Sequence, residues 1–80
     1  MDKNVNLVFC GQDSLKNQLY VGDLCRIVQP IDLRGNIVII MKKRQDKPNV
    51  ICEVFHKNSI EIVYAKTLIL LVHGFYTNGI

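Results

Sequence analysis

Residues 21–40, VGDLCRIVQPIDLRGNIVII, contain two apolar runs, and a turn signal opens each of them. Gly22-Asp23 precedes the first run, and Gly35-Asn36 precedes the second. Glycine next to Asp or Asn favours a tight turn, and a short run rich in Ile and Val between such turns favours a β-strand. The stretch therefore predicts two strands joined by a long loop, with no catalytic residue between them.

The same succession of apolar segments and turns continues to residue 72. The expected strands are residues 24–28, 37–42, 50–57, 60–64 and 68–72. A hairpin tip is expected near Asp46-Lys47, and a tight turn at Asn58-Ser59. Five short strands joined by short connections predict a mostly β fold, namely a small antiparallel barrel.

The N-terminal part of the chain has a weaker pattern. Leu15 and Leu19 stand four residues apart, which allows a short helix that begins at residue 13 or 14. We expect residues 1–19 to pack on the barrel or at an interface, residues 20–73 to form the barrel, and residues 74–80 to form a C-terminal tail.

The composition is that of one packed domain. Of the 80 residues, 49% are hydrophobic and 21% are charged. The apolar run of residues 68–72 is far shorter than the roughly 20 residues of a membrane helix, and we expect no secretion signal. Cys10, Cys25 and Cys52 cannot all pair within one chain, which favours reduced thiols in the core of a cytoplasmic protein.

In its order of turns and strands the chain resembles the SH3-like barrels. The matching residues are Gly22-Asp23 with Cys25 and Ile27, then Gly35-Asn36-Ile37, then Glu53-Val54-Phe55. Within that class the chain is most similar to the plasmid-borne type II dihydrofolate reductases, which build a tetramer around one central pore. The residues that resemble their GD-x-V-R, G-x-I-V and S-V-Q-I-Y motifs are 22–26, 35–38 and 59–63.

The resemblance implies an SH3-like barrel over residues 21 to about 71. For a true reductase it would also imply folate and a dihydronicotinamide cofactor in a shared pore. Glu61, Val63 and Ile27 stand where that family has its ligand-reading Gln, Tyr and Lys. Because Glu61 would repel acidic ligands in such a pore, we expect no cofactor. A diverged reductase relative remains a further alternative.

A basic cluster marks the expected hairpin tip. Four of the ten basic residues fall within six positions, next to Asp46, and they are Lys42, Lys43, Arg44 and Lys47. Such a cluster is suited to follow a phosphate backbone, although a solvated tip that protects a sheet edge has the same composition. We predict contact with nucleic acid or a nucleoprotein complex through this cluster, with help from Arg26, Arg34 and Lys57.

Both faces of the same hairpin are apolar. A turn centred on Asp46-Lys47 places Ile39 opposite Val54 and leaves a second apolar face on the other side. The N-terminal residues 5–9, a second copy of the chain or a separate partner must then cover that face. We expect self-association or a protein partner, through an interface formed by Val38, Ile40, Ile51 and Phe55.

No catalytic or metal-binding motif is present in the sequence. It has no Ser-His-Asp or Cys-His motif, no Gly-rich phosphate loop and no acidic metal cluster. Cys52 and His56 stand four apart on one strand, too far to share an ion. Asp23 is expected to accept a backbone N–H in its turn. The prediction is a non-catalytic intracellular binding module for nucleic acid, with a protein adaptor or inhibitor that uses an apolar sheet face as the alternative.

Overall fold

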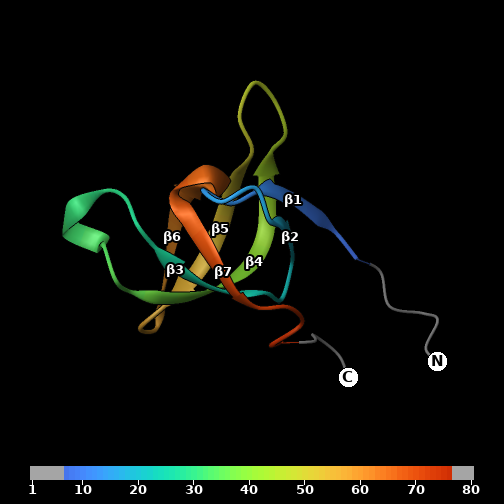
Figure 1. The fold of residues 1–80 in the computed structure, drawn as a ribbon. Helices are drawn as coiled ribbons and strands as arrows, with labels where there is room; N and C mark the ends of the chain where they lie inside the picture. Colours follow the sequence, from blue (N-terminus) through green and yellow to red (C-terminus); the bar gives the residue numbers. More distant parts are fainter. Residues whose placement is uncertain (1–6, 77–80) are drawn as a thin grey trace.

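The computed structural model describes residues 7–76 and contains seven β-strands and two 3-10 helices (Figure 1). The strands are β1 (Phe9–Gln12), β2 (Gln18–Tyr20), β3 (Leu24–Ile27), β4 (Ile37–Gln45), β5 (Ile51–His56), β6 (Ser59–Tyr64) and β7 (Leu68–Val72). The 3-10 helices are η1 (Ile31–Leu33) and η2 (Ala65–Thr67). Neither of these helices has the length or apolar character to cross a membrane. The expected mostly β class is confirmed.

Five strands form one antiparallel sheet in the order β6-β5-β4-β3-β7, and β1 pairs with β2 in a separate hairpin. These five are the strands that the sequence predicts, although β4 continues to Gln45, three residues past its predicted end. Lys57 and Asn58 have φ angles of 48° and 67° and form the two-residue turn between β5 and β6. The tight turn expected there is thus confirmed within one residue.

The expected short helix after residue 13 is wrong, because that segment is the loop between β1 and β2. The Asp13 carboxylate accepts hydrogen bonds from the backbone N–H groups of Leu15 and Asn17, each at 2.8 Å. Lys16 has a φ of 70°, which a right-handed helix does not contain. These local side-chain bonds satisfy the backbone in place of helical ones.

The predicted register of the β4–β5 hairpin is also wrong. Ile39 lies opposite Phe55 and Ile40 lies opposite Val54. The pairing is irregular at two places in β4, one directly after Ile40 and one directly before Gln45. A bulge adds a residue to one strand, so it changes which residues face each other without changing the apolar pattern of the sequence.

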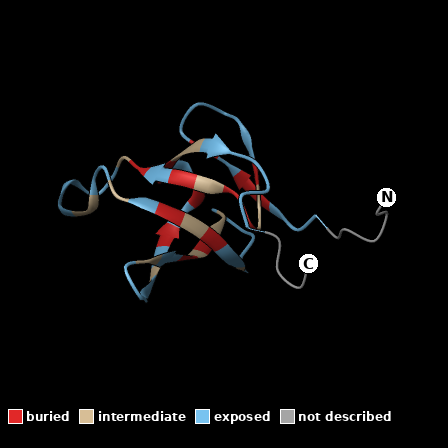
Figure 2. Cartoon of the chain, turned by 90° about the horizontal axis from the view of Figure 1, so that it is seen from below, coloured by how far each residue is buried: buried red, intermediate tan, exposed pale blue. Residues whose placement is uncertain are grey.

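The core lies between one face of the sheet and the β1–β2 hairpin. Buried and exposed positions alternate along the strands (Figure 2). The buried cluster consists of Cys10, Leu19, Cys25, Ile27, Val38, Ile40, Cys52, Val54, Val63, Ala65 and Leu68. The three cysteines in it are free thiols with 0% exposure, which confirms that they pack in the core.

Polar contacts hold the β1–β2 hairpin on the sheet. The second carboxylate oxygen of Asp13 accepts a hydrogen bond from the N–H of Leu70 in β7 at 2.7 Å. Gly11 has a φ of 83°, and a Cβ there would lie 2.8 Å from the Val50 side chain. The close approach of this hairpin therefore requires glycine at position 11.

Residues 73–76 lie against the turn that precedes β3. The buried Asp23 carboxylate accepts hydrogen bonds from the N–H groups of Tyr20 and Gly74, both at 2.9 Å. Its Oδ2 is also 2.9 Å from His73 Nδ1. The expected role of Asp23 as an acceptor in its turn is confirmed, and the same carboxylate binds the start of the C-terminal segment.

Candidate functional site

The basic cluster lies on the β4–β5 hairpin, whose tip projects beyond the rest of the molecule (Figure 1). Lys42, Arg44 and Lys47 are exposed there, and Lys43 is half-buried opposite Cys52. With nine residues, β4 extends over roughly 30 Å, so the tip stands well away from the other end of the sheet. Its cations are accessible to a large ligand.

Carboxylates neutralise two of the four hairpin cations. Arg44 Nη1 lies 2.9 Å from Glu53 Oε2, and Lys43 Nζ lies 3.6 Å from Asp46 Oδ1. The hairpin cations with no such carboxylate among residues 7–76 are Lys42 and Lys47. These two ammonium groups are therefore the best placed to bind an external phosphate.

The other three predicted cations do not join this cluster. Arg26 is exposed on β3, Arg34 follows η1 in the β3–β4 loop, and Lys57 lies in the β5–β6 turn. That loop and that turn lie at the end of the sheet opposite the hairpin tip, because β4 and β5 run from one end to the other (Figure 1). The seven predicted residues do not form one continuous patch.

The four residues expected to form an interface do not share one face of the sheet. Val38 and Ile40 are 1% and 0% exposed, inside the core, whereas Phe55 is 39% exposed on the other face. Ile51 is half-buried near the start of β5. The observed register accounts for this separation, because it turns Phe55 away from Val38 and Ile40.

A row of apolar side chains crosses the outer face of the sheet, which is turned away from the core. Its directly opposed members, one from each strand, are Ile60, Phe55, Ile39, Leu24 and Val72. Ile37 and Ile62 lie beside this line on β4 and β6, and we call all seven residues the outer apolar row. Of these, sequence reasoning identified only Phe55 as a surface residue. In β4 and β6, apolar residues stand at adjacent positions, and adjacent residues of a strand point to opposite faces of the sheet. That pattern could have indicated that Ile37, Ile39, Ile60 and Ile62 lie on a second apolar face.

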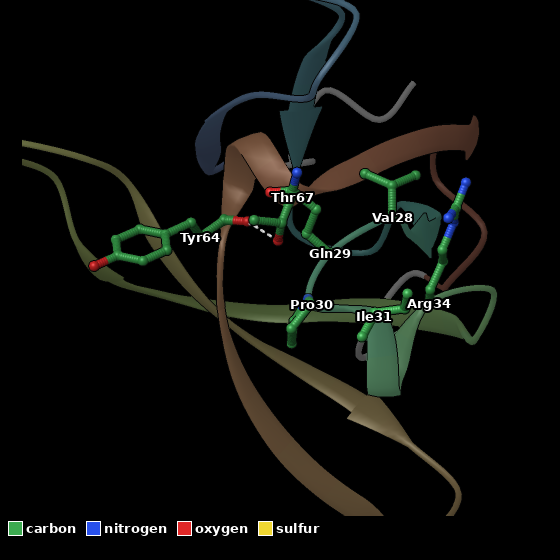
Figure 3. A pocket seen from close by; sticks show the side chains of 7 residues that line it. All are labelled: Val28, Gln29, Pro30, Ile31, Arg34, Tyr64 and Thr67. Carbon is green, nitrogen blue, oxygen red and sulfur yellow. Dashed lines mark hydrogen bonds between the residues drawn. The ribbon is translucent and has the colours of Figure 1, made fainter.

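A groove lies between the β3–β4 loop and the segment around η2. It holds about 810 Å³ and is lined by Val28, Gln29, Pro30, Ile31, Arg34, Tyr64 and Thr67. Figure 3 shows Tyr64 at one side and Arg34 at the other, with Pro30 and Ile31 between them. The groove could not be predicted from the sequence, since its two walls are 30 or more residues apart in the chain. It offers an apolar floor and one guanidinium group to a ligand.

The thiols are poorly suited to chemistry. Burial raises the pKa of Cys25 to about 12, and the nearby Asp23 acts in the same direction. The Cys52 thiol donates a hydrogen bond to the Cys10 carbonyl oxygen at 3.7 Å, and the contact between the two thiols lowers the pKa of Cys10 and raises that of Cys52. All three side chains are sealed from solvent, so a reagent cannot reach even the more acidic Cys10 thiol.

Within residues 7–76, no group of three or more His, Cys, Asp or Glu side chains is placed to hold a metal ion. Both ring nitrogens of His56 are shielded from solvent and have no hydrogen-bond partner there. One histidine without other ligands does not form a metal site.

The arrangement thus provides three candidate binding surfaces, which are a projecting basic hairpin, an apolar sheet face and a groove. Comparison with protein-family models, with curated proteins and with solved structures finds no match to this chain.

Proposed function

We propose that this chain is a non-catalytic intracellular binding module that contacts nucleic acid, alone or in a nucleoprotein complex, through the tip of the β4–β5 hairpin. One observation carries the proposal: Lys42 and Lys47 project from an extended hairpin and lack a carboxylate partner in residues 7–76. When a lysine ammonium group without a carboxylate partner binds a phosphate backbone, it displaces the counterions condensed there, and their release favours binding. A two-stranded β-ribbon also has dimensions that the major groove admits.

The fold supports a binding role for the hairpin. We assign the domain to the SH3-like barrels, on the basis of its strand order and of η2, which turns the chain between the edge strands β6 and β7. In support of this assignment, β1 packs against η2, the segment between the two edge strands. The hairpin strands β4 and β5 pair antiparallel up to Gln45 and Ile51, so a paired two-stranded ribbon carries the tip. The three free thiols favour a reducing compartment such as the cytoplasm.

The test is nucleic-acid binding measured by fluorescence anisotropy, on single- and double-stranded oligonucleotides over a range of salt concentrations. The quadruple Ala variant at Lys42, Lys43, Arg44 and Lys47 should bind more weakly, with a salt slope flatter by about one unit for each phosphate that the variant no longer neutralises. The double variant K42A/K47A should account for most of that loss, because the other two cations are already paired.

The matched control is R34A/K57A, which removes the same number of charges from the opposite end of the sheet. It should change affinity and salt slope less than K42A/K47A does. No binding by the unmodified chain at low salt, or an equal loss in the control, would contradict the proposal.

A second candidate is a protein adaptor or inhibitor. The outer apolar row supports it, since large exposed apolar faces mark protein-binding sites. This candidate requires the row to be free in the isolated chain. It is therefore excluded if a second copy of the chain already occupies the row.

The enzyme alternative, a diverged type II dihydrofolate reductase relative, has less support. At the three positions that matter, Ile27 is 0% exposed, Val63 is 6% exposed and Glu61 carries the wrong charge for acidic ligands. We expect no hydride transfer between NADPH and dihydrofolate and no saturable binding of either one by calorimetry. Turnover that disappears in a Glu61 variant would reverse this conclusion.

A further inference from the structure

The outer apolar row has the exposure of a contact surface. Five of its members, Ile37, Phe55, Ile60, Ile62 and Val72, are between 39% and 52% exposed. The other two, Ile39 and Leu24, are half-buried at its centre. Directly opposed apolar side chains thus extend across all five strands without a polar residue between them.

The described part of the chain leaves this face open. The β1–β2 hairpin covers the opposite face, where Cys10 and Leu19 enter the core. Residues 73–76 are held at the Asp23 turn, at the margin of the sheet. Residues 1–6, MDKNVN, and residues 77–80, TNGI, have only Met1, Val5 and Ile80 to offer as apolar cover.

The composition of the row resembles that of a core rather than that of a transient interface. It consists of four isoleucines, one leucine, one valine and one phenylalanine, with no Tyr, Trp or Arg. Transient interfaces are about as polar as the rest of a protein surface, whereas permanent homodimer interfaces resemble a domain core cut in half. Charged residues lie at the margin of the row: Arg26 is opposite Ile37, and Glu53, which is opposite Ile62, pairs with Arg44 at 2.9 Å.

The area also fits a dimer. The seven side chains together leave on the order of 500 Å² of apolar surface in water, at the upper end for a stable monomer. A dimer of standard size buries about 800 Å² on each partner, of which roughly 65% is apolar in homodimers. The row therefore supplies the apolar part of one half of such an interface.

We propose that the outer apolar row is the contact surface for a second copy of this chain. Two copies meet face to face as stacked sheets about 10 Å apart, with Phe55 and Ile39 near the two-fold axis. The end of the hairpin, with Lys47, lies outside this contact, whereas Lys42 lies opposite Glu53 at its margin, so a dimer presents two hairpin tips to a ligand.

The test is the mass of the full 80-residue chain in solution, by light scattering and sedimentation from 5 to about 200 µM. We expect twice the chain mass of 9.2 kDa. Ile60→Lys, in the row, should raise the dimer dissociation constant by about 100-fold or more. Ile31→Lys, on η1 and 81% exposed, introduces the same charge outside the row and should leave the dimer intact.

Circular dichroism establishes that both variants are folded. Independently of any variant, dilution of the unmodified protein should shift the NMR methyl signals of Ile39, Ile60 and Ile62 and not that of Ile31. A monomer at 200 µM, an Ile60→Lys chain that stays dimeric, or dilution shifts confined to Ile31 would each overturn the proposal. Contacts from residues 1–6 to Phe55 in a monomer would do the same. K47A, at the hairpin tip and away from the row, should weaken nucleic-acid binding and leave this mass unchanged, so the two proposals fail separately.

Discussion

The two faces of the five-stranded sheet have nearly the same residue types and very different surroundings. On the inner face, Val38, Ile40 and Val54 are at most 1% exposed beneath the β1–β2 hairpin. On the outer face, Ile62 and Phe55 are 52% and 39% exposed. Apolar composition therefore does not by itself show which face of a sheet is buried. In this chain the buried face is the one on which the β1–β2 hairpin packs, with Cys10 and Leu19 in the shared core.

The largest difference between the faces should appear when one isoleucine is shortened on each. Ile40→Ala leaves a cavity in the core and should lower the free energy of unfolding by about 2–5 kcal/mol. Ile62→Ala removes methyl groups that are already half in water and should cost less than about 1 kcal/mol in the monomer. Urea denaturation at low micromolar concentration measures both. Equal losses would mean that the outer face is covered within the monomer.

A smaller effect is expected from the polar contact that holds the inner cover in place. Burial alone would raise the pKa of Asp13, but hydrogen bonds from Leu70, Asn17 and Leu15 outweigh it and lower the pKa. A carboxyl with a lowered folded-state pKa stabilises the fold fully above its unfolded value of about 3.9, and this stability is lost as the pH falls through the lower folded value.

Asp13→Asn should therefore lower the free energy of unfolding by about 2 kcal/mol at pH 7. The difference between the two proteins should shrink as the pH drops below about 4, first because the unfolded-state carboxyl of Asp13 binds a proton and then because the folded-state carboxyl does, after which both side chains are uncharged. Urea denaturation midpoints of both proteins, measured from pH 7 to pH 2, report this difference in stability. A difference that stays constant over this range would show that Asp13 does not act through its charge.

The smallest effect is expected at the ion pair beside the outer row. Arg44 and Glu53 are 2.9 Å apart, but the Arg44 side chain is 54% exposed. Exposed pairs of this kind contribute about 0–1 kcal/mol, so Arg44→Ala should change the free energy of unfolding by less than about 1 kcal/mol. The dimer mass should also remain unchanged. A larger loss of stability would indicate that Glu53 is more buried in solution, as a tighter dimer contact would make it.

The binding surfaces could be predicted only in part. The basic cluster was visible as four cations within six positions, because those residues are neighbours in the chain. The pairing of Arg44 with Glu53 and the distance of Arg34 and Lys57 from the cluster could not be read from it. They depend on strand register and on which end of the sheet each connection occupies.

The sequence by itself determined the mostly β class, the five strands of the sheet and the turns at Gly22-Asp23 and Asn58, because strand and turn preferences act over a few adjacent residues. Only the tertiary structure decided the bulges in β4, and with them which side chains face the core and which face water. It also decided that Asp13 forms a loop instead of a helix, since one of its bonds comes from Leu70, 57 residues away. Contacts between residues so far apart cannot be predicted from the spacing of apolar residues in the sequence. They depend on the relative position of strands, which is established only when the chain folds.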